Sequence, residues 1–244
     1  MPSRTVAFVK FFTEEAHADQ FLKGSLFMRK LRYFQRLEAS EADDGRPDAH
    51  EGVVGWHQPD QTELTISFPG FDPIKITGAD LASPVAITRN VYSDMHIFCM
   101  STVRMPDPAE LSGDADEIKT QMLAGLRLDE QCLRFGPHAV VVDAGRFLAR
   151  LREALGGLGH WYRADAVKYY DRNTFNGGFC DEQAPFQKQD QFEYQQEYRI
   201  CLLTSVSGDE PMVFEVGDLS SFAVKMRSED VNGGFRLSLK TPTP

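Results

Sequence analysis

The sequence predicts an α+β fold: one domain over residues 1–244, with an antiparallel-dominated sheet and flanking helices. Short β-rich runs recur through the middle of the chain and follow one another at its C-terminal end. Helical periodicity is confined to a few segments between such runs. No internal repeat, low-complexity tract or long linker divides the 244 residues. These observations favour one mixed domain over two separate ones.

The first elements follow from local patterns. Residues 5–12 (TVAFVKFF) predict an opening strand. A helix is expected next, starting at Thr13 ahead of two glutamates and closing at Gly24 as its C-cap. Residues 25–28 predict a short strand. The segment 29–38 (RKLRYFQRLE) predicts a helix, with apolar residues at helical spacing and basic residues on the other side.

The later elements are less regular. An acidic polar loop is expected over 38–52. After it we expect short strands (64–68, 73–77, 84–89, 95–102), a helix near 117–131, a buried strand (138–143) and an amphipathic helix (145–155). The rest of the chain predicts a strand pair or extended segment (160–170), a flexible polar loop (171–190), and closing strands (198–204, 211–216, 222–227, 235–240).

Composition narrows the function classes. A formal charge of −10 disfavours a non-specific polyanion binder, although Arg29, Lys30, Arg32 and Arg36 form a basic island. The four cysteines show no CxxC spacing and the six histidines are scattered, so free thiols and no metal site are expected. The absence of a signal peptide and of an apolar stretch near 18 residues predicts a cytoplasmic protein with no membrane partner.

Two polar positions interrupt apolar strands. Lys10 lies inside the opening strand, where its charge must face water or find a partner inside a site. Ser101 and Thr102 end the run 95–102, and their hydroxyls either form a turn or reach into a cleft.

The segment 193–203 (EYQQEYRICLL) combines a polar half with an apolar half. On an extended chain Glu193, Gln195 and Glu197 all point to one side. Such a set is typical either of an edge strand with one wet face or of the floor of a polar active site.

The loop sequence GRPDAHEG places Arg46, Asp48 and Glu51 within six residues. A solvated acidic loop is one interpretation. The other is a binding loop, because a guanidinium with two carboxylates can hold a phosphate and a sugar hydroxyl together.

The order of these motifs resembles a broad bacterial family of uncharacterised proteins linked to abortive infection against phages. The similar segments span nearly the whole chain: FVKFF, FLKGSLFMRKLRYFQRLEA, RPDAHEG, IFCMS, HAVVVDAGRFL, AVKYYD, and Lys188 with YQQEYRI. The chain departs from the family at Pro47, between Arg46 and Asp48, and at Gln195, where related chains often carry Glu or another polar residue.

The same order of motifs is similar to the ADP-ribosyltransferase fold. That family places a basic or imidazole residue on its first strand, a hydroxyl-bearing or aromatic residue on a middle strand, and a late (Q/E)-x-E motif. The resemblance implies that Lys10 takes the first position, Ser101 and Thr102 the second, and Gln195 and Glu197 the third. The cofactor it implies is NAD, used as substrate.

Chemistry gives a reason for this set. Cleavage of the nicotinamide–ribose bond passes through an oxocarbenium-like state, which a carboxylate beside the ribose stabilises. We expect Glu197 to carry that role and Gln195 to orient the acceptor. Lys10 or Arg46 is expected near the pyrophosphate, with Asp48 and Glu51 on the same cleft.

Three functions stay open at this point. The first is an ADP-ribosyltransferase-like toxin or anti-phage defence effector that modifies a nucleic acid or protein and is held in check by an antitoxin or regulatory partner. The second is an NAD glycohydrolase, with water as acceptor. The third is a non-catalytic sensor or binding module that recognises a phage component or a nucleotide.

Overall fold

The centre of the molecule is β7 (His96–Met105), the longest strand of the fold. A computed structural model describes residues 4–36, 48–157, 159–206 and 208–236. Seven further strands join β7 in one antiparallel sheet: β1 (Arg4–Phe12), β2 (Ser25–Lys30), β8 (His138–Asp143), β9 (Trp161–Ala166), β13 (Glu197–Leu203), β14 (Met212–Glu215) and β15 (Ala223–Arg227).

The position of β7 in the sheet decides where a pocket forms. Ser101 pairs with Val9 of β1 on one side and with Glu197 of β13 on the other. Ile97 likewise pairs with Arg29 of β2 and with β13. Both β1 and β2 therefore lie along one edge of β7, one after the other, and β13 lies along the opposite edge. From β1 the sheet continues through β8 to β15, from β2 to β14, and from β13 to β9.

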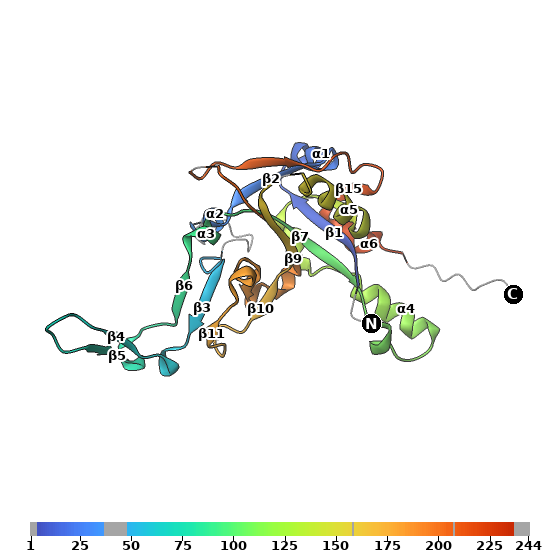
Figure 1. Cartoon of the computed structure of the whole chain (residues 1–244). Helices are drawn as coiled ribbons and strands as arrows, with labels where there is room; N and C mark the ends of the chain where they lie inside the picture. The colour runs from blue at the N-terminus through green and yellow to red at the C-terminus, as the bar shows by residue number, and fades with distance from the viewer. Residues whose placement is uncertain (1–3, 37–47, 158, 207, 237–244) are drawn as a thin grey trace.

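Helices cover both faces of this sheet (Figure 1). On one face α1 (Glu15–Leu22) and α5 (Ala144–Leu155) pack through Phe21, Phe147 and Leu151 against a core that includes Phe8. The strong periodicity of 145–155 arises because its apolar stripe lies on this core. On the other face, residues that follow α4 (Ala115–Gly125) and those of α6 (Val231–Gly234) close a second cluster over β1.

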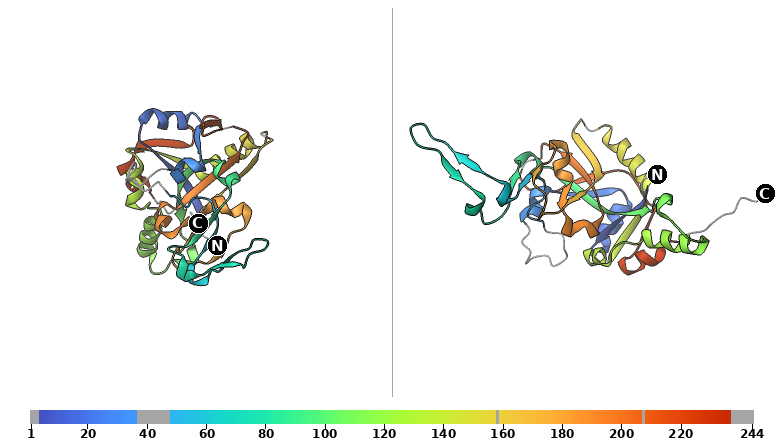
Figure 2. Two further views of the ribbon diagram at one scale, coloured as in Figure 1. Left: turned by 90° about the vertical axis from the view of Figure 1, so that its left-hand side faces the viewer. Right: turned by 90° about the horizontal axis from the view of Figure 1, so that it is seen from below.

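A smaller layer of strands lies beside the large sheet. It contains an antiparallel sheet of β3 (Val53–His57), β6 (Val85–Thr88) and β11 (Gly177–Gly178), and the parallel pair β10 (Lys168–Tyr170) and β12 (Gln187–Gln189). The helices α2 (Leu31–Arg36) and α3 (Asn90–Ser93) join it to the large sheet. Beyond it the hairpin of β4 (Leu64–Ile66) and β5 (Ile74–Ile76) projects away from the body (Figures 1 and 2).

Most predicted elements are confirmed. The structure has the expected opening strand, the strand over 138–143 and the helix beginning at the next residue, within a single α+β domain of mostly antiparallel sheet. None of the described helices has the length and apolar composition to cross a bilayer.

Three predicted segments are wrong. The helix near 117–131 ends at Gly125, and a short 3-10 helix follows over Glu130–Phe135. The loop 171–190 contains β11, β12 and a 3-10 helix, because it packs on the smaller strand layer. Residues Asp190–Gln195 are also 3-10 helical, so Glu193 does not share one extended face with Gln195 and Glu197. The last predicted strand, 235–240, lies mostly outside the described residues, and Phe235 precedes no strand within them.

Candidate active site

A pocket of about 770 Å³ opens where the two strands on one edge of β7 separate. The β1 ladder reaches Ser101, whereas the β2 ladder begins at Ile97. Between these pairings the backbone of β7 borders the pocket, and Lys10 Nζ donates to the Cys99 carbonyl at 2.7 Å. Where β1 and β2 separate, the Lys10 side chain thus takes the place of a backbone N–H as the donor to a β7 carbonyl. A pocket of this size suits a drug- or nucleotide-sized ligand.

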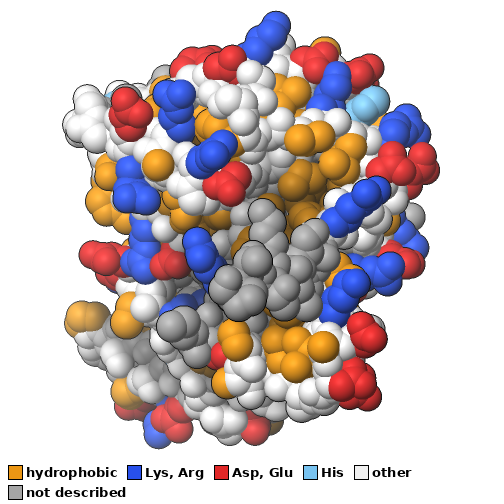
Figure 3. Space-filling model, turned by 90° about the vertical axis from the view of Figure 1, so that its right-hand side faces the viewer, with side chains coloured by type: hydrophobic (Ala, Val, Ile, Leu, Met, Phe, Trp, Pro, Cys, Tyr) orange, Lys and Arg blue, Asp and Glu red, His pale blue; other side chains and the backbone are white. Residues whose placement is uncertain are grey.

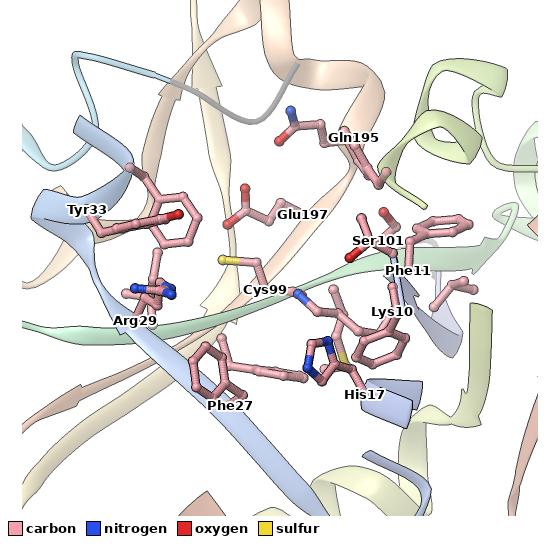
Figure 4. Close-up of a pocket in the computed structure, with 18 of the residues that line it drawn as sticks. Lys10, Phe11, His17, Phe27, Arg29, Tyr33, Cys99, Ser101, Gln195 and Glu197 are labelled. Atoms are coloured by element: carbon pink, nitrogen blue, oxygen red, sulfur yellow. The ribbon is translucent and has the colours of Figure 1, made fainter. Parts of the chain in front are cut away.

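Aromatic and charged side chains share the lining (Figure 4). The aromatic part comes from five elements: Phe11, Phe12, Phe27, Tyr33, Phe34, Phe98 and Phe135. The polar part includes Lys10, His17, Arg29, Glu51, Ser101, Lys188, Gln195 and Glu197. Apolar walls with a few convergent polar groups are typical of small-molecule sites.

Arg29 forms one side of the pocket together with two rings. Its guanidinium lies 4.2 Å from the Tyr33 ring centroid and 5.4 Å from that of Phe27. Figure 4 shows Arg29 and Tyr33 stacked on the side facing Glu197 and Cys99. Phe27 is half exposed, so it lies where the pocket meets solvent. A cation held between two rings offers a site for an anionic group beside surfaces on which a planar ring can stack.

The inner end of the pocket carries an ion cluster, formed by Glu51, Lys188, Glu197 and Arg199. The Arg199 side chain is fully buried and contacts Glu197 Oε1 through Nε at 2.6 Å and Glu51 Oε2 through Nη1 at 2.7 Å. Lys188 Nζ lies 3.2 Å from Glu51 Oε1 and 3.3 Å from Glu197 Oε2. Each carboxylate therefore meets both cations.

Three separate segments bring the ion cluster together. Glu51 precedes β3, Lys188 lies on β12, and Glu197 and Arg199 point to the same side of β13 because they are two residues apart. Arg199 Nη1 also donates to the Pro185 carbonyl at 2.6 Å. The buried guanidinium is satisfied by these partners, which is the condition under which a charge is tolerated in a core.

A residue with left-handed backbone conformation, Gln196, orients the side chains on either side of it, just before β13. Gln196 has φ of 42°, and its carbonyl accepts from Thr102 N and Thr102 Oγ1, both at 2.9 Å. The turn places Gln195 Oε1 2.9 Å from Lys188 Nζ, the same cation that meets Glu197. Gln195 and Glu197 therefore converge by a turn, whereas the sequence predicted that a flat strand would align them.

The ion cluster fixes the charge of Glu197. Burial alone raises the pKa of this carboxyl, but the positive charges of Arg199 and Lys188 and the hydrogen bond from Arg199 outweigh burial and hold the pKa well below its usual range. The pKa of the neighbouring Cys99 thiol is raised, by burial first and by the charge of Glu197 second. At neutral pH the pocket therefore contains a carboxylate and a protonated thiol, which is a poor nucleophile.

Asp48 lies behind the ion cluster. Burial, and then the charge of Glu51, raises the pKa of Asp48 to about 6, although His50 N donates to its Oδ1 at 2.8 Å. An acid whose pKa is raised on folding is favoured in its protonated form. Its ionisation therefore reduces stability as pH rises from the unfolded value, 3.8, through about 6.

We expect Asp48→Asn to stabilise the protein at pH 7.5 by on the order of 2 kcal/mol, because the amide keeps the His50 contact without a buried charge. At pH 4.5 the gain should fall to roughly a third, because this pH is only slightly above the unfolded pKa of 3.8, where the effect begins. Urea unfolding at both pH values measures it. Asp72→Asn, which removes an exposed carboxylate, is the matched control; an equal effect from both variants would contradict the prediction.

The structure brings together five of the eight residues that the sequence singled out: Lys10, Glu51, Ser101, Gln195 and Glu197 line the pocket. Asp48 is buried behind Glu51 and does not line it. Thr102 does not line it either, because its hydroxyl is bonded to the turn at Gln196. Arg46 lies outside the described residues. The solvated-loop interpretation is wrong for Asp48 and Glu51, which are both buried.

Sequence reasoning gave no role to Arg199, Arg29 or Tyr33. Arg199 had a usable signal: like Lys10, it is a cation inside an otherwise apolar strand, where only a buried partner or a wet face can accommodate it. No such signal marked Arg29 and Tyr33, because the basic segment 29–38 that contains them is equally typical of a solvated helix. In the described part of the chain no three potential metal ligands come together.

Comparison with known proteins adds no relative: no family model, no curated protein and no solved structure matches this chain.

Proposed function

We propose that the protein is an NAD-consuming enzyme of the ADP-ribosyltransferase type, acting as a toxin or anti-phage defence effector. The observation that supports this best is the placement of Glu197, a carboxylate kept ionised by Arg199 and Lys188 at the inner end of an aromatic pocket with Lys10 and Arg29 on its walls. A dinucleotide needs ring surfaces, cations for its phosphates, and a carboxylate at the ribose. The proposal also rests on the resemblance of the motifs to that fold.

The proposed reaction breaks the bond between ribose C1′ and the nicotinamide nitrogen. The bonding electrons leave with nicotinamide, and the positive charge that develops on the ribose is stabilised by the Glu197 carboxylate. An acceptor nucleophile then attacks C1′ and gives up its proton. Gln195, held by Lys188 beside Glu197, is placed to orient that acceptor, and Ser101 lies opposite Glu197 across the β7–β13 pairing.

Charge favours a protein or water as acceptor over a nucleic acid. The chain carries a net charge of −10, which opposes approach of a polyanion. On the face shown in Figure 3, Lys and Arg are interspersed with Asp and Glu rather than gathered in one basic area. A nucleic acid acceptor would have to rely on the local cations at the pocket.

A second candidate is a nucleotide-binding sensor without turnover. It is favoured by one observation: both Glu197 oxygens are engaged by the ion cluster, at 2.6 Å and 3.3 Å. A carboxylate whose two oxygens are both bonded to cations can stabilise the fold without ever contacting a substrate. In a sensor, the aromatic walls and Arg29 bind the ligand and the ion cluster only stabilises the inner end.

Incubation with NAD carrying a label in its adenylate part separates these functions. With cell lysate present, label attached to a macromolecule supports transfer, and free ADP-ribose in buffer alone supports hydrolysis. Unchanged NAD with saturable binding supports the sensor. Unchanged NAD without binding would overturn both the enzyme and the sensor for NAD.

A further inference from the structure

The β4–β5 hairpin has an apolar face that the described chain leaves uncovered. We define the arm as residues 63–77, which project clear of the body in Figure 1 and in the right-hand view of Figure 2. Its two strands pair in the register Leu64 with Ile76 and Ile66 with Ile74. Directly paired residues share a face, so these four aliphatic side chains lie together on one side of the arm.

The other side of the arm is polar. Thr65 pairs with Lys75, and Lys75 Nζ lies 3.2 Å from Glu63 Oε1. Strict alternation of apolar and polar residues is typical of a strand with one buried face. Here that face is exposed: Ile66 is 41% and Ile74 56% accessible, and beyond them Phe68 and Phe71 are 57% and 78% accessible. A two-stranded hairpin is only marginally stable alone, so a covering surface is expected.

We propose that the arm is a self-association surface, and that its apolar face packs against the same face of a second copy of this chain. A two-fold arrangement places identical faces against each other and leaves both Glu63–Lys75 pairs on the outside. Because the two faces are identical, apolar side chains of one copy meet apolar side chains of the other. This inference does not depend on the chemistry of the pocket.

Charge supports a second copy as the occupant. The arm contains Glu63, Asp72 and Lys75 as its only charged residues, which gives it a net charge of −2 + 1 = −1 in a chain of −10. A nearly neutral arm that extends away from an acidic body lets two copies approach with little repulsion, because body charges beyond the Debye length of about 8 Å are screened.

The area is sufficient for a weak, reversible dimer. From the exposed fractions, the large apolar side chains of one arm offer roughly 500 Å². If this area is covered completely, two arms bury about 1,000 Å² in total, the lower limit for a specific interface. We therefore expect a Kd on the order of 1–100 μM, since interfaces of this size are not tight without strong anchors.

Sedimentation of the full chain across this concentration range tests the proposal. The weight-average mass should rise from that of one chain toward that of two. Phe71→Lys and Ile74→Lys should each weaken association at least tenfold, because each places a charge in the apolar contact. Both side chains are largely exposed, so both variants should unfold at the wild-type temperature.

Val224→Lys is the matched control, since Val224 is 58% exposed on β15 of the large sheet, outside the arm. It should leave the Kd unchanged. A wild-type chain that stays monomeric throughout the range would overturn the proposal and assign the arm to a different protein. A dimer that neither arm substitution weakens, or that Val224→Lys weakens equally, would also overturn it.

Discussion

Glu197→Gln should reduce the kcat for NAD by about a hundredfold or more while the chain stays folded. The amide keeps the shape of the side chain and removes the negative charge that faces the oxocarbenium-like state, and loss of one such contact in a preorganised site typically costs this factor. The measurement is release of nicotinamide from NAD under saturating substrate, together with circular dichroism and thermal unfolding of both proteins.

The ion cluster provides a matched control for this substitution. Glu51 meets the same two cations, with Lys188 at 3.2 Å and Arg199 at 2.7 Å, so Glu51→Gln removes an equivalent buried charge. We expect a similar loss of stability from both variants, but a kcat loss below about tenfold for Glu51→Gln, because the carboxylate proposed to face the ribose is still present. Equal kcat losses would show that the ion cluster acts only through the fold. Turnover of NAD by Glu197→Gln at the wild-type rate would overturn the catalytic role proposed for Glu197.

Arg199→Met should lower the free energy of unfolding by about 3–5 kcal/mol at pH 7.5, the usual effect of removing one partner from a buried ion pair. The fully buried guanidinium contacts both carboxylates of the ion cluster and a backbone carbonyl. Without it, Lys188 is the only cation left in the ion cluster for Glu51 and Glu197. Urea unfolding followed by fluorescence measures the loss.

The pH dependence of this loss identifies its cause. In the wild type the lowered pKa of Glu197 gives stability that is present above its unfolded value, 4.5, and lost as pH falls through the folded pKa. Removing Arg199 leaves burial opposed by Lys188 and raises that pKa, so the deficit should be complete at pH 7.5 and should shrink as pH falls through the raised pKa of the variant. Arg36→Met is the control: Arg36 is paired with Asp209 at 2.7 Å but is 66% exposed, and its loss should cost less than about 1 kcal/mol. A deficit that stays constant as pH is lowered until Glu197 is protonated in the variant would assign the effect of Arg199 to packing.

Local patterns predicted much of the fold because many of its strands and helices are specified by residues that are neighbours in the sequence. The apolar run over 138–143 and the 3.6-residue period after it specify a buried strand and a core-facing helix wherever they occur. The segment before Glu197 failed for the opposite reason. Its polar composition is compatible with a strand, and the 3-10 helix with a left-handed Gln196 is stabilised by Thr102, almost a hundred residues away in sequence.

The sequence by itself determined which residues carry unusual polarity: Lys10 within a strand, the carboxylates after Arg46, and Gln195 and Glu197 near the end. It did so because a charge in an apolar run is a local feature with a known energetic cost. Only the tertiary structure decided that Glu51, Lys188, Glu197 and Arg199 neutralise one another, and that the split between β1 and β2 opens a pocket in front of them. Pairing of charges and separation of strands depend on contacts between distant segments, and these contacts follow from how the whole sheet packs.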